Sequence, residues 1–407
     1  MKQIITFLGT RLEPTAYSFK ERSYTGCCFA EVLRQFEDYE RMRVFVTPEA
    51  RASAWPTVEG WGDARIVPVD IPRGESEGEL WGIFDKLTEV VGEKDRLVYD
   101  ITHGLRSIPF LVFLAAAYLK EARGVTLEAI YYGARELRSA ERPAPVVDLS
   151  PFVRLLDWLA ATRQFIATGD ARDLATILRA EGREHDEGPL GRWGKNLGQF
   201  SLALQLCRPL EVMEEAGRLG EGLRFAQPVL EQVARPFALL APRIQEEYVA
   251  RGLSQPTEPA NVQESLRRQL GLVRWYLDRN QVIQAMTLAR EWLVTAVGWR
   301  LGRGFTLQGN ERKPLEEGIT GLGKLGTRKE DGAAFGEADL NEVGRELFKY
   351  SECDLIRKLQ SNLFTLRNDL DHAGMRPRPK AAEELQDLAQ GRIWRQFEEL
   401  AKRWALV

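Results

Sequence analysis

A short segment near the end of the chain places an arginine, an asparagine and a histidine within six residues. It reads Arg367-Asn368-Asp-Leu-Asp-His372, and the 407-residue chain contains only three histidines. Metal-free cleavage of RNA needs a group that deprotonates the 2′-hydroxyl, a group that protonates the leaving 5′-oxygen, and a cation for the phosphorane charge. We expect His372 to transfer protons, Arg367 to supply the cation, and Asn368 to orient the phosphate or the imidazole.

Helix geometry limits how the arginine and the histidine of this segment can meet. Positions five residues apart on a straight helix are separated by ~140°, so Arg367 and His372 do not share one face comfortably. The glycine and prolines that follow, Gly374, Pro377 and Pro379, predict a prompt helix end. His372 therefore either turns back toward Arg367 at the helix end or meets a second copy of the chain. The alternative is a surface arginine followed by a helix-terminal histidine at a favourable dipole position.

Two loops near the N-terminus gather polar residues after strand-like segments. In open α/β sheets, ligands bind at the carboxyl ends of strands, where helix N-termini offer N–H groups to anions. We therefore expect an anionic ligand at these loops, with Arg106 holding a phosphate and Gly104 allowing close backbone approach. His103 and Asp100 would add base-reading or acid–base capacity. The residues concerned are Gly9, Thr10 and Arg11 in the first loop and Asp100, Thr102, His103, Gly104, Arg106 and Ser107 in the second.

A structural explanation of the second loop also stays open at this stage. Asp100 and Thr102 would then cap the helix that follows, and His103 would lie on the surface. The Gly-Thr turn of the first loop is weak support for a ligand, and neither loop has the GxGxxG pattern of dinucleotide-binding sites.

The first 150 residues alternate between strand-like and helix-like segments. Apolar strands separated by helices indicate a parallel sheet that is covered on both faces, so we predict a doubly wound, Rossmann-like α/β domain. The strand-like runs are 4–8, 43–47, 66–69, 97–101 and 127–132, and the helical patterns are roughly 28–39, 78–91 and 105–120.

After residue 150 the pattern becomes helical. Residues 301–340 contain nine glycines in forty, which predicts a mobile insertion without regular structure. We expect tryptophans 275, 292, 299, 394 and 404 to lie in the core. The remaining predicted features are helices to about 251, a proline-containing break at 252–259, one long helix or two over 262–300, and helices at about 340–370 and 381–404.

Composition narrows the classes of function. The formal net charge is -3, from 56 Lys and Arg against 59 Asp and Glu, which disfavours duplex packaging or polybasic membrane binding. The four cysteines lack CxxC spacing, so we expect reduced thiols and no metal site. His185 lies in an acidic stretch and is expected at the surface. The longest apolar run, 108–119, is shorter than the ~20 residues of a membrane span, and no signal-type start is present. We expect a cytoplasmic protein.

Several segments of the first 160 residues resemble the CRISPR-associated Rossmann fold (CARF) domain. They are LGT in the first loop, Tyr17 and Tyr24, DITHGLRSIPF, IYYGA and VVDLSPFVRLLDW, in that order. The resemblance is closest to the CARF ribonucleases of type III CRISPR systems. It implies a dimer that binds cyclic oligoadenylate, a second messenger made when the interference complex detects target RNA. Gly9, Thr10, Arg11, Asp100, Thr102, His103, Gly104 and Arg106 would then line or border that pocket.

The C-terminal segment resembles the HEPN (higher eukaryotes and prokaryotes nucleotide-binding) ribonucleases. The likeness covers roughly 262–407 and rests on the Arg367-Asn368-x-x-x-His372 pattern and on the helix AMTLAREWLVTAVGWRL, in which Glu291 would support the site. The implied organisation is a CARF sensor over 1–150, a helical linker over 151–260 and a HEPN domain over 261–407.

The expected function is a metal-independent, single-stranded RNA endoribonuclease of type III CRISPR antiviral defence that cyclic oligoadenylate activates. It would act as a homodimer, need no cofactor, and leave a 2′,3′-cyclic phosphate. The resemblance favours a ring of four adenylates as activator. One alternative is a non-enzymatic nucleotide sensor, although the sequence has no winged helix-turn-helix with a basic recognition helix. Another is additional degradation of the ligand through Thr10 or His103.

Overall fold

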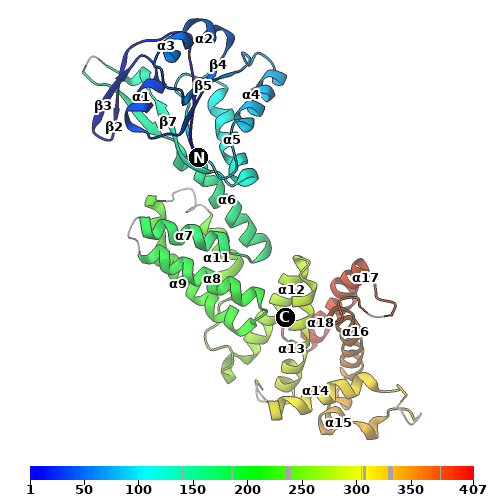
Figure 1. The fold of residues 1–407 in the computed structure, drawn as a ribbon. Coiled ribbons are helices and arrows are strands. Elements are labelled where there is room, and N and C mark those ends of the chain that lie inside the picture. The colour runs from blue at the N-terminus through cyan, green and yellow to red at the C-terminus, as the bar shows by residue number, and fades with distance from the viewer. Residues whose placement is uncertain are drawn as a thin grey trace. The chain divides into compact units, whose positions relative to one another are not determined.

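The structure is a computed structural model of the chain, and it divides into two compact units (Figure 1). One unit comprises Met1–Asp157 and the other Trp158–Val407, and each is described by itself. The described residues are all except 140, 185–187, 234–237, 239, 304, 306–308, 329–332 and 376. The position predicted for His185 therefore lies outside the described residues.

The N-terminal unit contains a mostly parallel eight-stranded sheet, which confirms the predicted α/β fold class. The strand order is β3-β2-β8-β7-β6-β1-β4-β5. Strand β1 pairs in parallel with β4 on one side and β6 on the other, while the β2–β3 and β7–β8 pairs are antiparallel. The strands are β1 Lys2–Phe7, β2 Thr15–Phe19, β3 Arg22–Gly26, β4 Arg41–Val46, β5 Ile66–Asp70, β6 Arg96–Asp100, β7 Thr126–Gly133 and β8 Ala144–Asp148.

Helices cover both faces of this sheet. Successive strand residues point to opposite faces, so Ile4 of β1 packs with the buried residues of α1, α2 and α3. Its neighbour Ile5 packs with α4 and α5. The sheet is therefore doubly wound, as predicted. The helices are α1 Phe29–Phe36, α2 Pro48–Ser53, α3 Trp55–Glu59, α4 Glu77–Glu89 and α5 Ile108–Arg123, with a short 3₁₀ turn, η1 Arg135–Leu137, after β7.

Three strands were missed by the sequence analysis. Strands β2 and β3 form a hairpin in which Tyr17 faces Tyr24. Its two-residue turn, Lys20-Glu21, has φ of 46° and 65°, a left-handed conformation that is usually signalled by Asn-Gly or Asp-Gly. Two long charged residues gave no such signal. The third strand, β8, contains Pro145, a residue that argues against a strand.

The second unit is helical throughout most of its described length. The expected helix over 262–300 is two helices, which are joined by a turn in which Asn280 has φ of 57°. The helices are α6 Ser150–Thr168, which begins in the first unit, then α7 Arg172–Glu184, α8 Gly188–Gln205, α9 Pro209–Val233, α11 Ala241–Tyr248, η2 Val249–Arg251, η3 Pro259–Asn261, α12 Val262–Asp278, α13 Val282–Arg300, α14 Gly309–Lys324, η4 Glu337–Asp339, α15 Glu342–Phe348, α16 Cys353–Asp371, α17 Ala382–Asp387, the π-helical turn η5 Leu388–Ile393, and α18 Trp394–Arg403.

One hydrophobic core runs through this unit, from Trp158 to Leu406. Four of the five named tryptophans are buried in it and Trp299 packs against it, which confirms their predicted role. The core includes residues on both sides of position 260. The separate identities of a linker and a HEPN domain stay predictions.

The prediction of an irregular, mobile segment over 301–340 was wrong for its central part. Residues 309–324 form α14, which packs against α15 and α16. Glycine here allows close helix packing: a Cβ placed on Gly318 would lie 2.7 Å from Cγ1 of Val343 and 2.9 Å from the backbone nitrogen of Gly344. Glycine density alone did not separate a close helix contact from a flexible loop.

This contact predicts that Gly318→Ala destabilises the helical unit. The added methyl group overlaps backbone atoms that cannot move aside as a side chain would, so we expect a loss of about 1–3 kcal/mol of unfolding free energy. Gly271→Ala is the matched control, since Gly271 lies in α12 and a Cβ placed there would have nothing within 4 Å. The control should be neutral or stabilising through helix propensity. Equal denaturant midpoints for the two variants would contradict the packing argument.

Candidate functional site

The Arg367–His372 segment lies at the C-terminal end of α16. This helix buries a leucine stripe that includes Leu359, Leu363 and Leu366, and the burial fixes which of its faces remain accessible. Directly after the segment, Ala373 and Gly374 have φ of 50° and 74°, so the helix ends promptly, as predicted.

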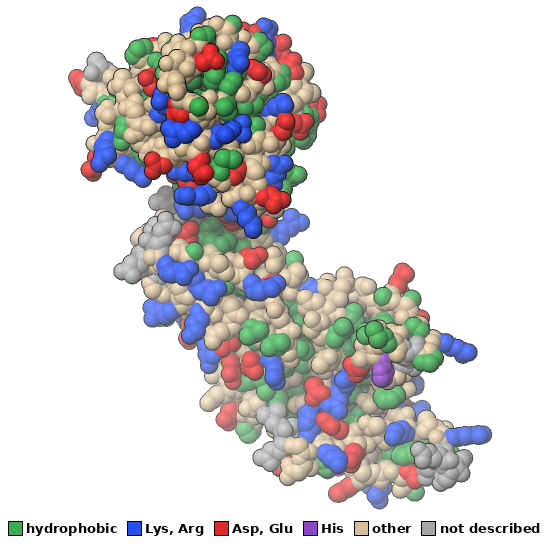
Figure 2. Space-filling view, in the orientation of Figure 1, with side chains coloured by type: hydrophobic (Ala, Val, Ile, Leu, Met, Phe, Trp, Pro, Cys, Tyr) green, Lys and Arg blue, Asp and Glu red, His purple; other side chains and the backbone are tan. Residues whose placement is uncertain are grey.

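His372 does not fold back toward Arg367. It is the C-cap residue of the helix, its backbone has left the helical region with φ of -89° and ψ of 4°, and its side chain is exposed. Figure 2 shows basic (blue) and acidic (red) side chains interspersed over the visible face of the helical unit. The side chain that reaches Arg367 is Asp371, four residues along the same face, with 3.6 Å between Nη2 and Oδ2. Of the two arrangements considered above, only the meeting with a second chain remains open.

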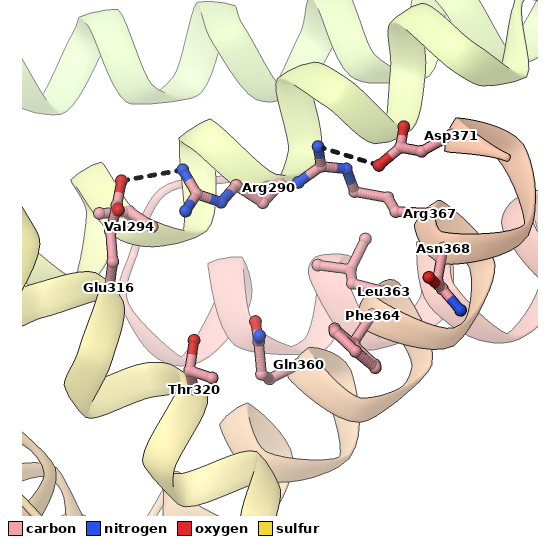
Figure 3. Close-up of a pocket in the computed structure, with 10 residues that line it drawn as sticks. All are labelled: Arg290, Val294, Glu316, Thr320, Gln360, Leu363, Phe364, Arg367, Asn368 and Asp371. Carbon is pink, nitrogen blue, oxygen red and sulfur yellow. Dashed lines mark hydrogen bonds and ion pairs between the residues drawn. The ribbon is translucent and has the colours of Figure 1, made fainter.

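Arg367 and Asn368 line a cleft between α13, α14 and α16 (Figure 3). In this view Arg290 and Arg367 lie along one side, each paired with an acid, and Thr320, Gln360 and Phe364 lie along the other. The Arg290 Nη1 to Glu316 Oε1 distance is 2.9 Å. The cleft thus combines two guanidinium groups with neutral hydrogen-bonding groups and one aromatic ring, a combination suited to a phosphate and an adjacent base.

An ion-pair network holds one wall of the cleft in place. Arg290 contacts both Glu291, at 2.6 Å, and Glu316, and Arg312 contacts the same two carboxylates. Burial raises the pKa of Glu316, but the hydrogen bond and charge of Arg290 outweigh it and keep the pKa below its ordinary value. Glu291 thereby reaches Arg290 without lining the cleft itself. Its supporting role, inferred from the resemblance, stays a prediction.

Two residues of this cleft were missed by the sequence analysis. Arg290 is one turn from buried residues of α13, and nothing in its own segment showed that it faces α16. Phe364 lies three residues before Arg367 and is 64% exposed, unlike the buried tryptophans. The signal available for Phe364 was its place in the exposed stripe of α16. For Arg290, the only signal is the packing of α13 against α14 and α16, which the sequence does not show.

The predicted N-terminal loops do meet at one edge of the sheet. After β1 and the β2–β3 hairpin, the chain forms β4 and β5 on one side of β1 and then β6 and β7 on the other, so the strand order reverses beside β1. Ligand sites of open α/β sheets lie at such reversals. A Cβ placed on Gly9 would lie 3.8 Å from Cβ of His103, so the loop after β1 touches the loop after β6.

Asp100 and Thr102 form hydrogen bonds with other groups of the protein. Asp100 is fully buried at the end of β6, where it accepts hydrogen bonds from Thr6 Oγ1 at 2.6 Å and from the Thr102 N–H at 2.7 Å. Burial raises the pKa of Asp100 to about 6, against the lowering effect of these hydrogen bonds. Thr102 Oγ1 in turn accepts from the Gly133 N–H at 2.8 Å, which ties the loop to β7.

His103 serves as a helix cap. Its Nε2 accepts a hydrogen bond from the N–H of Phe29, the first residue of α1, at 3.1 Å. Burial and then the charge of Arg135 lower the pKa of His103 to about 4, so the imidazole is neutral near pH 7. A cap of this kind satisfies one of the free N–H groups of a helix N-terminus. Any part of His103 in ligand binding or turnover stays a prediction.

The exposed polar side chains of the predicted set are Thr10, Arg11 and Arg106. Gly104 is required where it stands, because a Cβ there would lie 2.8 Å from Cβ of Ile108. Two arginines in the turn after β7, Arg135 and Arg138, were not predicted at this site, and both pair with Glu13 of the loop after β1. Their position directly after a parallel strand was the signal that could have placed them at this edge.

Two further observations concern the described part of the chain. Within it, no three His, Cys, Asp or Glu side chains are grouped so that they could hold a metal ion. None of its helices combines the length and apolar character that crossing a bilayer requires.

The cap predicts an unusually low pKa for His103. Protonation would break the bond to the Phe29 N–H, so we expect the ring to titrate near pH 4 in NMR spectra, with its signal identified by loss in His103→Gln. The unfolded chain binds this proton already near pH 6.5, so the contribution of His103 to stability is lost as the pH falls from 6.5 toward 4. Titration near pH 6.5 in the folded protein would show that the ring is not buried as a cap.

Comparison with known proteins adds a relation over the middle of the chain. Residues 154–251, from within α6 to η2, match the family model of the second domain of CRISPR-associated protein MJ1674. Over 132 residues, 32% of this chain, the sequence is 32% identical to CRISPR-associated protein MJ1674 of Methanocaldococcus jannaschii. The matched part spans 20% of the length of that relative. The family-model match relates residues 154–251 to a CRISPR-associated protein, and the second match relates a stretch of 132 residues to the same protein.

Proposed function

We propose that the protein is a metal-independent, single-stranded RNA endoribonuclease of CRISPR defence, activated by cyclic oligoadenylate. The observation that carries this proposal is the cleft that Arg367 and Asn368 line, with His372 at the adjacent helix end. Two further observations support it. The loops after β1 and β6 meet at a strand-order reversal, and the middle helices are similar to a CRISPR-associated protein.

The chemistry follows from the groups at the end of α16. Arg367 binds the scissile phosphate and stabilises the charge that develops on the phosphorane. The ion pair that it makes with Asp371 is long and Asp371 is 62% exposed, so a phosphate can replace the carboxylate at little cost. His372 exchanges protons with the 2′-oxygen or the leaving 5′-oxygen. Attack of the 2′-oxygen on phosphorus then gives a 2′,3′-cyclic phosphate and a 5′-hydroxyl.

One chain supplies one histidine to this reaction, which needs both a base and an acid. His372 also lies about 140° around the helix from Arg367, so the second copy is the natural source of the missing groups. A symmetric dimer would bring both sets together. Asn368 is four residues before His372 on the same side of α16, where it would orient the phosphate or the imidazole.

An apolar stripe on the sheet unit supports self-association. Phe110, Leu114 and Tyr118 follow each other at four-residue spacing along α5 and are 67%, 41% and 57% exposed. Phe84 of α4 extends the stripe, with its ring 5.9 Å from that of Tyr118. Apolar stretches of this kind mark protein interaction sites on soluble proteins.

Activation requires that the ligand favours one arrangement of the dimer over another. The sheet edge with Thr10, Arg11 and Arg106 exposed is the proposed ligand site, and the resemblance favours cyclic tetra-adenylate. The shared core from Trp158 to Leu406 would let the middle helices and α16 move together.

The first test is cleavage of a fluorescent single-stranded RNA by the full chain, with and without cyclic tetra-adenylate. We expect cleavage that depends on the ligand, persists in EDTA, and falls at least a hundredfold in His372→Ala, because no other group replaces its proton transfer. Met375→Ala is the matched control, since Met375 is 89% exposed three residues further on.

Each other result has a definite meaning. Cleavage that needs Mg²⁺, or that His372→Ala retains, would refute the mechanism. Cleavage without any response to cyclic oligoadenylates would refute the proposal that the sheet unit senses this ligand. No cleavage under any ligand would favour the non-enzymatic sensor.

A second test concerns the exposed ring of the cleft. If Phe364 stacks on a base beside the scissile phosphate, Phe364→Ala should lose about 1–3 kcal/mol of RNA affinity. Phe225→Ala is the control, because Phe225 of α9 is 72% exposed and lies outside this cleft. Fluorescence anisotropy with the inactive His372→Ala background measures binding alone. Equal affinities for the two phenylalanine variants would remove Phe364 from the site.

A further inference from the structure

A second groove lies on the other side of α16, away from the cleft that Arg367 lines. It consists of two adjoining hollows that share Asn362 and Arg392, and we call it the α16 groove. Its walls are α16, the end of α14, and the α17–η5–α18 segment. The charged lining residues are Arg357, Lys358, Lys380, Arg392 and Arg395, with Glu384 and Asp387.

The charge of the groove is opposite to that of the chain. Five of its lining residues are basic and two, Glu384 and Asp387, are acidic, while the whole chain carries -3. Glu384 is already paired with Lys380. Lys358 and Arg392 are exposed, and no ion pair joins either of them to an acid among the residues that the structure describes. The groove therefore offers unneutralised cations to an anionic ligand.

Neutral polar groups complete the lining. Asn362 Nδ2 donates to Gln396 Oε1 at 3.0 Å across the groove, and Ser361 and Thr365 provide hydroxyls. No aromatic side chain is among the described lining residues. The groove thus suits a sugar–phosphate backbone rather than a stacked base.

The groove runs beside the candidate catalytic segment. Thr365, which lines the groove, and His372 are seven residues apart, two helical turns, so helix geometry points His372 toward the groove side of α16. Asn368 lies between it and Arg367, which lines the cleft. The far wall is fastened to the same segment, because the Lys380 N–H donates to Oδ2 of buried Asp369 at 3.3 Å. A single-stranded RNA that continues from the scissile phosphate past His372 would enter the groove directly.

The π-helical turn η5 shapes the remaining wall. It joins α17 to α18 over Leu388–Ile393, and Arg395 Nε donates a hydrogen bond to the Gly391 carbonyl at 3.1 Å. Turns of this kind in a helix are frequent at functional sites because they redirect side chains. Here the turn places Arg392 where the two hollows join.

We propose that the α16 groove binds the backbone of single-stranded RNA on one side of the cut, without regard to its sequence. This rests on the proposed function. The groove extends the substrate site beyond the scissile phosphate, and Lys358 and Arg392 are phosphate contacts.

The test uses RNA binding by the inactive His372→Ala chain, so it does not depend on catalysis. We compare Lys358→Ala/Arg392→Ala with Lys402→Ala/Arg403→Ala, which removes the same charge from the exposed end of α18 outside the groove. The groove variant should bind a 20-nucleotide single strand roughly tenfold more weakly, and the slope of log affinity against log salt should fall by about 1.4, for two lost phosphate contacts. In the control variant, the RNA affinity and the salt slope should change only as much as the change in net charge requires.

Several outcomes would overturn the proposal. An equal loss of RNA affinity in both double variants would do so, and so would a failure of the inactive chain to bind RNA. The same holds if polyglutamate binds the groove as tightly as RNA does. In the active chain, the groove variant should raise KM and leave kcat unchanged, and a fall in kcat alone would contradict a binding role. If the wild type binds RNA through the groove but never cleaves it, the proposed endoribonuclease function is refuted, while the proposal that the α16 groove binds RNA is supported.

Discussion

The burial of one leucine stripe on α16 is the constraint on which both the cleft that Arg367 lines and the α16 groove depend. Leu359, Leu363 and Leu366 are buried in the common core, and replacing such a leucine with alanine typically costs about 2–5 kcal/mol. The stripe therefore fixes the rotation of α16 about its axis. Once that rotation is set, Arg367 must face α13 and α14, and Asn362 must face η5 and α18. No separate interaction is needed to aim either side chain.

In the sheet unit, the polar groups that hold the loop in place are likewise different residues from those that are exposed. Asp100, Thr102 and His103 use their hydrogen-bonding groups to join β6 to β1, β7 and α1. They hold the loop in one conformation, and a preformed loop loses less conformational entropy when a ligand binds. The side chains left exposed at this edge, such as Arg106, are then free to meet a ligand. A polar residue in a predicted site can thus build the site without touching what binds there.

The elements predicted correctly from the sequence are those whose local pattern of apolar residues reflects burial, as continuous runs in strands and as a helical period in helices. The parallel strands and most helices follow such patterns. The spacing of Arg367, Asn368 and His372 made the end of α16 the candidate site, and their catalytic roles stay a prediction. The hairpin was missed because Lys20 and Glu21 adopt left-handed conformations without the usual turn residues. Helix α14 was missed because Gly318 serves close packing, which depends on a partner far along the chain. Arg290 was missed for the same reason, since its neighbours in space come from other helices.

The end of α16 also explains why one chain is an incomplete catalyst for the proposed reaction. The helix continues to Asp371, so Arg367 pairs with Asp371 on its own face and His372 emerges on the neighbouring one. A phosphate held by Arg367 is therefore not held by the same turn of helix that carries His372. Bending the last turn would bring them together but would break the bonds that the Ala373 and Gly374 N–H groups make to the last carbonyls of the helix. In the proposed dimer, a two-fold axis beside α16 would achieve the same meeting at no such cost, because it would place the histidine of one chain opposite the arginine of the other.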